Sequence, residues 1–169
     1  MSDDLPFDDF YRATSRRMMR FAYGMLGDTG TAQDIVQEAY IRAWRRWSEI
    51  SRYDQPEAWV RLVVSRLATD WWRRVMVRRR YEATERPPDP EPAPSETTVL
   101  LVAALRQLPA RQRQAFCLHH LLDLTVADIA RELAVSEGTV KSWLFRARAS
   151  LADQLGSLKP ATTEGSDVH

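Results

Sequence analysis

The chain has 169 residues, of which 44% are hydrophobic and six are glycine, so it can fold into one ordinary domain or two very small ones. Its single cysteine, Cys117, excludes an internal disulfide, and no apolar run approaches the roughly 18 residues that a membrane-spanning helix needs. The acidic N-terminus lacks the basic and then apolar order of a signal peptide, so we expect a cytoplasmic protein.

The net charge of +1 hides an uneven distribution of charge along the chain. Seven arginines and one acid, Asp70, lie between Arg61 and Arg80, whereas residues 81–98 hold five acids and one arginine. Nearly every cation is an arginine, whose planar guanidinium suits phosphates and base edges. A genome-wide bias toward arginine codons explains the arginine excess equally well.

A proline-rich, acidic segment from Pro87 to Pro94 divides the chain into two lobes. Its prolines lack backbone donors and favour an extended, solvated chain, so we expect a flexible linker over residues 83–96. The N-terminal lobe then spans residues 6–82 and the C-terminal lobe residues 97–155, and the polar stretch 156–169 is expected to be disordered.

Both lobes are expected to be helical, which makes the chain an all-α protein. Apolar residues recur at spacings of three and four, and no alternating stretch is bounded by hairpin turns. Residues typical of helix boundaries, such as Pro56, Pro109 and Ser136, separate the elements. The expected helices cover residues 7–26, 31–48, 56–80, 97–107, 110–122, 126–134 and 138–153.

The second expected helix has two distinct faces. Its apolar face carries Val36, Ala39, Tyr40, Ala43 and Trp47. The opposite face carries Asp34, Gln37, Glu38, Ile41 and Arg45. A polar face with one isolated aliphatic residue suits a partner interface, although a face that is simply solvated has the same periodicity.

The third expected helix combines aromatic residues with the arginine run. Trp59, Trp71 and Trp72 are core candidates, because tryptophan more often packs in a core than stacks on a ligand. Asp70 lies at helical spacing from the arginines that follow it, which predicts a local ion pair.

The stretch from Thr125 to Ser150 has the dimensions of a helix-turn-helix. Its first helix directs Ile129 and Leu133 inward, with Ala130 small enough for a second helix to cross close above it. A turn follows at residues 134–136.

The second helix of this motif separates packing side chains from free ones. Val140, Leu144, Ala147 and Leu151 share one narrow sector. Lys141, Ser142, Phe145 and Arg146 share another. Two cations, a hydroxyl and an aromatic suit a DNA major groove, where they contact guanine edges, phosphates and thymine methyls. A solvated face on an ordinary helical hairpin is the alternative, and it does not explain the aromatic residue.

The C-terminal lobe closely resembles region four of extracytoplasmic-function sigma factors, which give bacterial RNA polymerase its promoter specificity. The resemblance rests on Leu108–Arg113, Asp128–Leu133, Gly138–Ser142 and Arg146–Arg148. It implies that this lobe reads the minus-thirty-five promoter element and contacts the flap of the second-largest polymerase subunit. The DNA contacts that it implies are Lys141, Ser142, Phe145, Arg146 and Arg148.

Two residues depart from the family pattern in this lobe. Trp143 stands where arginine is common, which changes the expected DNA preference. Ala134 stands where a turn glycine is usual, and a left-handed alanine there would cost roughly 1–2 kcal/mol.

The segment Asp34–Ala39, with Arg42–Trp44, closely resembles region 2.2 of the same family. The resemblance implies that this helix grips the clamp helices of the largest polymerase subunit. Asp34, Gln37 and Glu38 fall on the contact positions, and Ile41 shares their face. A stand-alone DNA-binding regulator needs no such docking helix.

The segment from Pro56 through Val63–Arg74 resembles the family region that captures the minus-ten promoter element as a melted single strand. The resemblance implies contacts by Tyr53, Arg61, Arg66, Arg73 and Arg74. Arg66 stands where many relatives carry asparagine, so a different base preference is expected. The run Ala68–Arg73 favours the actinobacterial, sigma-E-like branch of the family.

No catalytic constellation is compatible with the helical placement, so we expect no enzyme, no cofactor and no metal. His119 and His120 are adjacent and diverge on a helix, and one cysteine gives no zinc set. No P-loop or dinucleotide fingerprint occurs. A metal-dependent nuclease is the leading enzymatic alternative, but it needs clustered inward carboxylates that we cannot identify.

These features together predict a sigma factor that binds the RNA polymerase core and promoter DNA. A stand-alone helix-turn-helix regulator and a sigma-like adaptor without initiation activity stay open as alternatives. An anti-sigma factor is a further partner that the resemblance suggests, and no membrane insertion is expected. No pattern predicts a large interface between the lobes, so we expect a monomer whose lobes move relative to one another.

Overall fold

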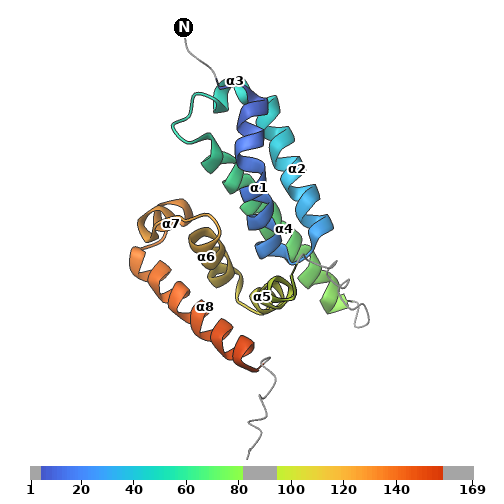
Figure 1. The fold of residues 1–169 in the computed structure, drawn as a ribbon, viewed down its shortest axis with the longest axis vertical. Helices are drawn as coiled ribbons and strands as arrows, with labels where there is room; N and C mark the ends of the chain where they lie inside the picture. Colours follow the sequence, from blue (N-terminus) through green and yellow to red (C-terminus); the bar gives the residue numbers. More distant parts are fainter. Residues whose placement is uncertain (1–4, 82–94, 158–169) are drawn as a thin grey trace, which may run out of the picture.

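The computed structural model describes residues 5–81 and 95–157, and every regular element in those ranges is a helix (Figure 1). The N-terminal lobe contains α1 (Phe7–Leu26), α2 (Thr29–Arg45), α3 (Trp47–Ile50) and α4 (Pro56–Tyr81). The C-terminal lobe contains α5 (Glu96–Arg106), α6 (Ala110–His120), α7 (Val126–Leu133) and α8 (Glu137–Ser157). The predicted all-α fold is confirmed, whereas the proline-rich segment and the last twelve residues lie outside the described ranges.

Local chemistry sets the boundary between α1 and α2. Gly27 ends α1 with a left-handed backbone (φ 72°), and its N–H donates to the Tyr23 carbonyl. The Asp28 side chain then accepts from the Thr31 backbone N–H at 2.8 Å and caps α2. The sequence predicts a helix start at Thr31, but α2 begins at Thr29 because Asp28 is the better-placed cap.

The second helix also ends earlier than predicted. Arg46 leaves the helical conformation (φ −117°, ψ 20°), so α2 ends at Arg45 and Trp47–Ile50 forms the separate short helix α3. Ile50 is fully buried and fixes this turn to the bundle.

Helices α1, α2 and α4 pack around one apolar core. Met18 and Phe21 of α1 and Val60 and Val64 of α4 are fully buried. Burial of such side chains stabilises a fold by about 1.5–3 kcal/mol each. The core therefore fixes which faces of α2 and α4 point to solvent.

Three side-chain caps stabilise the helix starts of the C-terminal lobe, and one buried arginine stabilises the turn after α5. Ser95, Thr125 and Ser136 accept backbone N–H groups at the starts of α5, α7 and α8. Arg113 is buried and donates to the Leu105 and Leu108 carbonyls, both at 2.9 Å. It thereby joins the C-terminal end of α5 to the turn that precedes α6.

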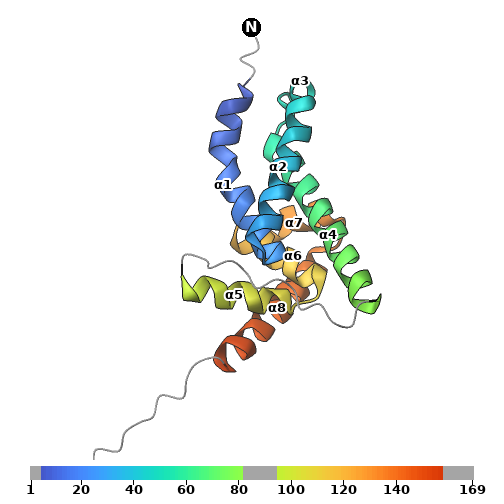
Figure 2. The ribbon, with the colours of Figure 1, turned by 90° about the vertical axis from the view of Figure 1, so that its right-hand side faces the viewer.

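The two lobes pack against each other, which the sequence did not lead us to expect. Both views show α5 lying at the end of the N-terminal bundle where α1 ends (Figures 1 and 2). Helices α5 and α6 contact α1, and buried residues of both lobes form one continuous core.

Ala134 at the turn between α7 and α8 has a left-handed backbone, with φ 55° and ψ 47°. We expect Ala134→Gly to raise the free energy of unfolding by about 1 kcal/mol. Glycine removes the steric cost of roughly 1–2 kcal/mol, while its greater freedom in the unfolded chain offsets part of the gain. Urea unfolding of the two proteins measures the difference.

Ala149 supplies the matched control, because it is exposed within the right-handed helix α8. Ala149→Gly should lower the free energy of unfolding by about 1 kcal/mol. Equal losses in both variants would contradict strain at the turn.

Candidate nucleic-acid and protein interfaces

The predicted docking residues lie on one solvent-facing side of α2. Asp34, Gln37 and Ile41 are exposed, and Glu38 is half-exposed and accepts from the Arg42 guanidinium at 2.7 Å. The opposite side of the helix packs in the core, as the periodicity predicted. The structure thus brings all four predicted residues onto one accessible face.

A groove between α1 and α2 extends this face and includes an aromatic residue, Trp44, that is not among the predicted docking residues. Its volume is about 220 Å³, and it is lined by Phe7, Tyr11, Gln37, Tyr40, Ile41 and Trp44. Trp44 is 64% exposed. The spacing 37, 41 and 44 puts these positions on one side of a helix, and that signal could have identified the tryptophan.

The side chain of Tyr40, which lines the groove, contacts two residues of α1. The Tyr40 hydroxyl lies 2.7 Å from Thr14 Oγ1, and its ring packs edge-on against Tyr11 with centroids 4.9 Å apart. Burial raises the pKa of Tyr40 to about 12, so this hydroxyl stays neutral at physiological pH.

The predicted recognition face of α8 is fully accessible. Lys141, Ser142, Phe145 and Arg146 are all exposed, and Phe145 is 73% exposed. Val140, Leu144, Ala147 and Leu151 are buried against the other helices of the lobe. A large aromatic side chain left in water between two cations is typical of a surface that another molecule covers.

Two neighbouring residues of α8 differ in their surroundings. Trp143 is half-buried and packs against the core. Because it stands where arginine is common in the family, this surface carries one cation fewer. Arg148 is exposed and its guanidinium nitrogens lie 3.4 Å from His120 Nε2.

The loop before α4 carries Tyr53, which is 39% exposed. Its hydroxyl donates to Glu49 Oε1 at 2.6 Å. This hydrogen bond and the Arg46 guanidinium hold the pKa of Glu49 below its usual range. The tyrosine ring is therefore anchored at its hydroxyl end and accessible at its faces.

The four arginines predicted along α4 fall into two groups. Arg66, Arg73 and Arg74 are exposed, and Asp70 lies 3.8 Å from Arg73 as the helical spacing predicted. Arg61 is buried and pairs with Glu132 of the other lobe. In this arrangement only the exposed three are accessible to a phosphate backbone.

The three tryptophans of α4 are half-buried and pack against the core, in agreement with their assignment as core candidates. They are Trp59, Trp71 and Trp72.

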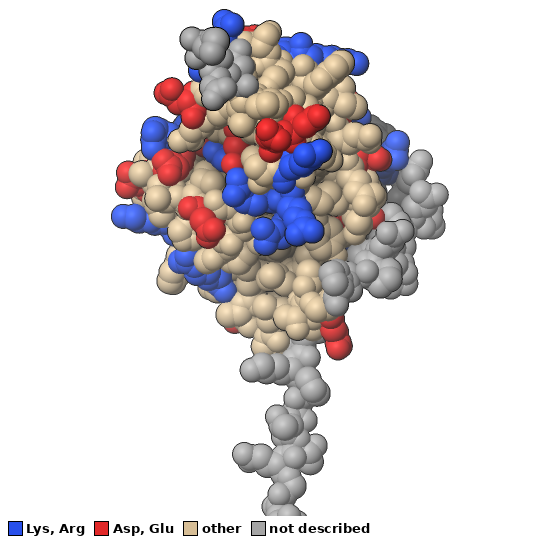
Figure 3. Space-filling view, turned by 45° about the horizontal axis from the view of Figure 1, so that its top comes forward, with Lys and Arg blue, Asp and Glu red and all other residues tan. Residues whose placement is uncertain are grey.

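Basic side chains gather on the surface although the net charge is small. Figure 3 shows a central group of Lys and Arg side chains bordered by Asp and Glu. Such a pattern directs an anionic partner to one place rather than attracting it over the whole surface.

Within residues 5–81 and 95–157, no three His, Cys, Asp or Glu side chains are grouped to hold a metal ion. The helices in those ranges also include none with the length and apolar character needed to cross a membrane.

Two family models match the chain. Residues 10–78 match Sigma-70 region 2, and residues 98–151 match Sigma-70 region 4. The two matches cover the N-terminal and the C-terminal lobe in the order that the sequence motifs predicted.

Characterised relatives match along most of the chain. It is 31% identical over 157 residues to RNA polymerase sigma-E factor of Streptomyces coelicolor, covering 92% of this chain and 89% of that protein. It is 34% identical over 158 residues to ECF RNA polymerase sigma factor SigM of Mycobacterium tuberculosis, covering 92% and 80%.

The fold is also found in a solved structure. The sigma factor RpoE from Bartonella quintana, in complex with the anti-sigma factor NepR, superposes with a TM-score of 0.73 at 22% identity. The superposition covers 91% of this chain and 98% of that one. The family models and the relatives together show that the chain belongs to the extracytoplasmic-function sigma factors, a non-enzymatic family that directs transcription initiation by RNA polymerase.

Proposed function

We propose that this sigma factor docks on the polymerase core through the exposed face of α2 and reads promoter DNA through α8 and α4. The observation that carries this proposal is an exposed aromatic residue on each lobe, Trp44 in the groove beside α2 and Phe145 between cations on α8. Exposed aromatics of this size are typical of binding surfaces, where they supply much of the contact energy.

The proposed polymerase surface joins charge and apolar area. Asp34 and Glu38 provide acidic groups for a basic partner surface, and Ile41 and Trp44 line the adjoining groove. Helices in a partner bind such a groove by inserting apolar side chains. This combination supports the clamp helices of the largest subunit as the partner.

The proposed minus-thirty-five surface is α8. Lys141 and Arg146 are placed to bond phosphates or guanine edges, and Phe145 to contact a thymine methyl. Ser142 adds a hydroxyl, and Arg148 adds a phosphate contact at the side of the helix. The flap of the second-largest subunit is the proposed protein partner of this lobe.

The proposed minus-ten surface combines the ring of Tyr53 with a cationic track. A flipped base stacks on an aromatic ring, while arginines neutralise the backbone of the melted strand. Arg66, Arg73 and Arg74 are exposed for that role, and Arg61 joins them only after its interlobe ion pair breaks.

We also propose an inhibitory protein partner and a cytoplasmic location, where the polymerase is found. The solved Bartonella quintana relative is bound to an anti-sigma factor, and a protein of that kind would cover the α2 and α8 faces here. The free chain is proposed to be a monomer.

In vitro transcription over a promoter library tests the proposal. Bacterial core polymerase is incubated with and without the protein, and transcript starts are sequenced. We expect new starts downstream of one shared two-part motif. Unchanged starts with folded protein and a cognate core would contradict initiation activity and favour an adaptor.

A further inference from the structure

The last turns of α4 carry two apolar side chains that the proposed function does not use. Met76 is 57% exposed and Val77 is 54% exposed. The Trp72 indole N–H donates to the Met25 carbonyl at the end of α1, and α4 continues past this contact to Tyr81. Both views show this end of α4 extending beyond the N-terminal bundle (Figures 1 and 2). The two side chains are therefore left to solvent at the end of the helix.

Exposed arginines flank the two apolar residues. Arg73, Arg74 and Arg78 are all exposed. Met76 follows Arg73 by three positions and Val77 follows Arg74 by three, so each lies one helical turn beyond an arginine on the same side of the helix. The cationic track proposed for the minus-ten strand thus continues into a surface of Met76, Val77 and Arg78, which we call the distal surface of α4.

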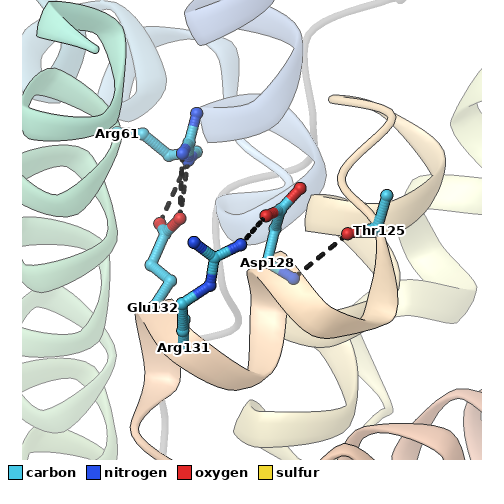
Figure 4. A network of polar contacts seen from close by, with 5 residues as sticks. All are labelled: Arg61, Thr125, Asp128, Arg131 and Glu132. Atoms are coloured by element: carbon cyan, nitrogen blue, oxygen red, sulfur yellow. Dashed lines mark hydrogen bonds and ion pairs between the residues drawn. The ribbon is translucent and has the colours of Figure 1, made fainter. Parts of the chain in front are cut away.

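The charge of this part of α4 is available to an anionic partner. Arg61, near the start of the helix, points at Glu132 and is buried in that ion pair (Figure 4). Arg73, in contrast, has only an exposed contact of 3.8 Å to Asp70. Arg78 forms no ion pair with any residue that the structure describes. Exposed cations held this weakly can exchange a local partner for a phosphate.

The direction of α4 places the distal surface relative to the promoter. Under the proposed function, Tyr53 captures the melted minus-ten strand just before α4 begins at Pro56. The lobe that reads the minus-thirty-five element follows α4 in the chain, and that element lies upstream. The C-terminal end of α4 therefore points upstream, toward DNA that is still double-stranded.

The length of the helix sets how far upstream a contact falls. Met76 follows Arg66 by ten positions, which is about 15 Å at about 1.5 Å per residue. That span equals about four base pairs at about 3.4 Å each. A tilt of α4 across the groove shortens the span. The contact is therefore expected within about four base pairs upstream of the base that Arg66 faces.

The major groove of duplex DNA matches the chemistry of this surface. It presents one apolar group, the C5-methyl of thymine, between two rows of phosphates. Resting on the proposed function, we propose that the distal surface of α4 reads a thymine in the duplex just upstream of the minus-ten element. Met76 and Val77 contact its methyl group, and Arg78 contacts a phosphate at the edge of the groove.

A promoter library tests this proposal. Holoenzyme assembled from the full chain and core polymerase transcribes promoters in which the duplex just upstream of the minus-ten element is randomised. We expect thymine to be enriched at one position there. Deoxyuridine at that position removes only the methyl group and should lower transcription about fourfold, because burying one methyl contributes roughly as much as burying one CH₂ group.

The double variant Met76→Gln with Val77→Thr keeps the size of both side chains and makes them polar. It should transcribe the thymine and deoxyuridine promoters equally. Leu5→Gln is the matched control, because Leu5 is 45% exposed and lies outside this surface, and it should keep the thymine preference. Both sites are exposed, so far-ultraviolet circular dichroism should show an unchanged helix content.

Arg78→Gln tests the phosphate contact separately. It should weaken binding to all promoters alike and reduce the slope of log affinity against log salt concentration by about 1. An unchanged slope would remove Arg78 from the proposed contact.

The outcomes separate this proposal from the proposed function. Enriched minus-ten and minus-thirty-five elements without any preference in the randomised duplex would overturn the proposal and leave the proposed function intact. A deoxyuridine effect that persists in the double variant would also overturn it, because another residue would then contact the methyl. Weaker core binding by the double variant, with its thymine preference unchanged, would assign the surface to the polymerase instead. The absence of any shared motif would count against the proposed function itself.

Discussion

Glu38→Arg is expected to weaken binding to the polymerase core by roughly 100-fold, because a like-charge contact across an interface costs several kcal/mol. The Glu38 carboxylate is half-exposed on the α2 face and contacts only Arg42 of its own helix. Its replacement by arginine removes an acid and adds a further cation to a surface that we assign to a basic partner. Titration of labelled protein with core polymerase measures the change.

The fold should tolerate this substitution. Exposed ion pairs at this helical spacing contribute about 0.3–0.5 kcal/mol, so the loss of the Arg42 contact changes the free energy of unfolding little. Asp153→Arg is the matched control, because Asp153 is exposed on α8 and its reversal changes the net charge equally. Normal core affinity in Glu38→Arg, or equal losses in both variants, would remove the support for docking through α2.

Arg146→Ala is expected to retain core binding and lose promoter selection. Arg146 is exposed beside Phe145 on the face of α8. A bidentate arginine contact to a base contributes about 1–3 kcal/mol of discrimination, so preference at one minus-thirty-five position should fall by roughly 5- to 150-fold. Competition between promoter variants in transcription by the holoenzyme measures this preference.

Arg16→Ala controls for the loss of one positive charge, since Arg16 is exposed on α1 of the other lobe. It should leave the ranking of promoter variants unchanged. If Arg146→Ala weakens all promoters equally and reduces the salt dependence of binding, the residue contacts phosphate and not a base. An unchanged ranking with unchanged salt dependence would rule out α8 as the reading face at this position.

Helices and their faces were predictable because their determinants are local. Ile41 and Glu38 on α2 and Phe145 on α8 were assigned to solvent-facing sides from spacing alone, and the structure places them there. Boundaries were less predictable where several residues compete as caps. Asp28 and Thr31 are both good capping residues, and only the backbone path after Gly27 decides between them.

The docking groove was only partly predictable. The side of α2 followed from periodicity, but the groove needs Phe7 and Tyr11 of α1, and the helix-to-helix register sets their positions. Trp44 belongs to the Arg42–Trp44 motif, but its exposure was not predictable, because tryptophan is usually buried.

The sequence by itself determined an all-helical chain, two lobes, a helix-turn-helix with a turn at residues 134–136, and the solvent-facing sides of α2 and α8. These features depend on interactions between residues close in the chain. Only the tertiary structure decided that the lobes close on each other. Arg61 and Glu132 are 71 positions apart, and each is a charged residue that helical periodicity alone would leave in solvent. Their burial follows from the position of α7 beside α4, a contact between the lobes that no local pattern records.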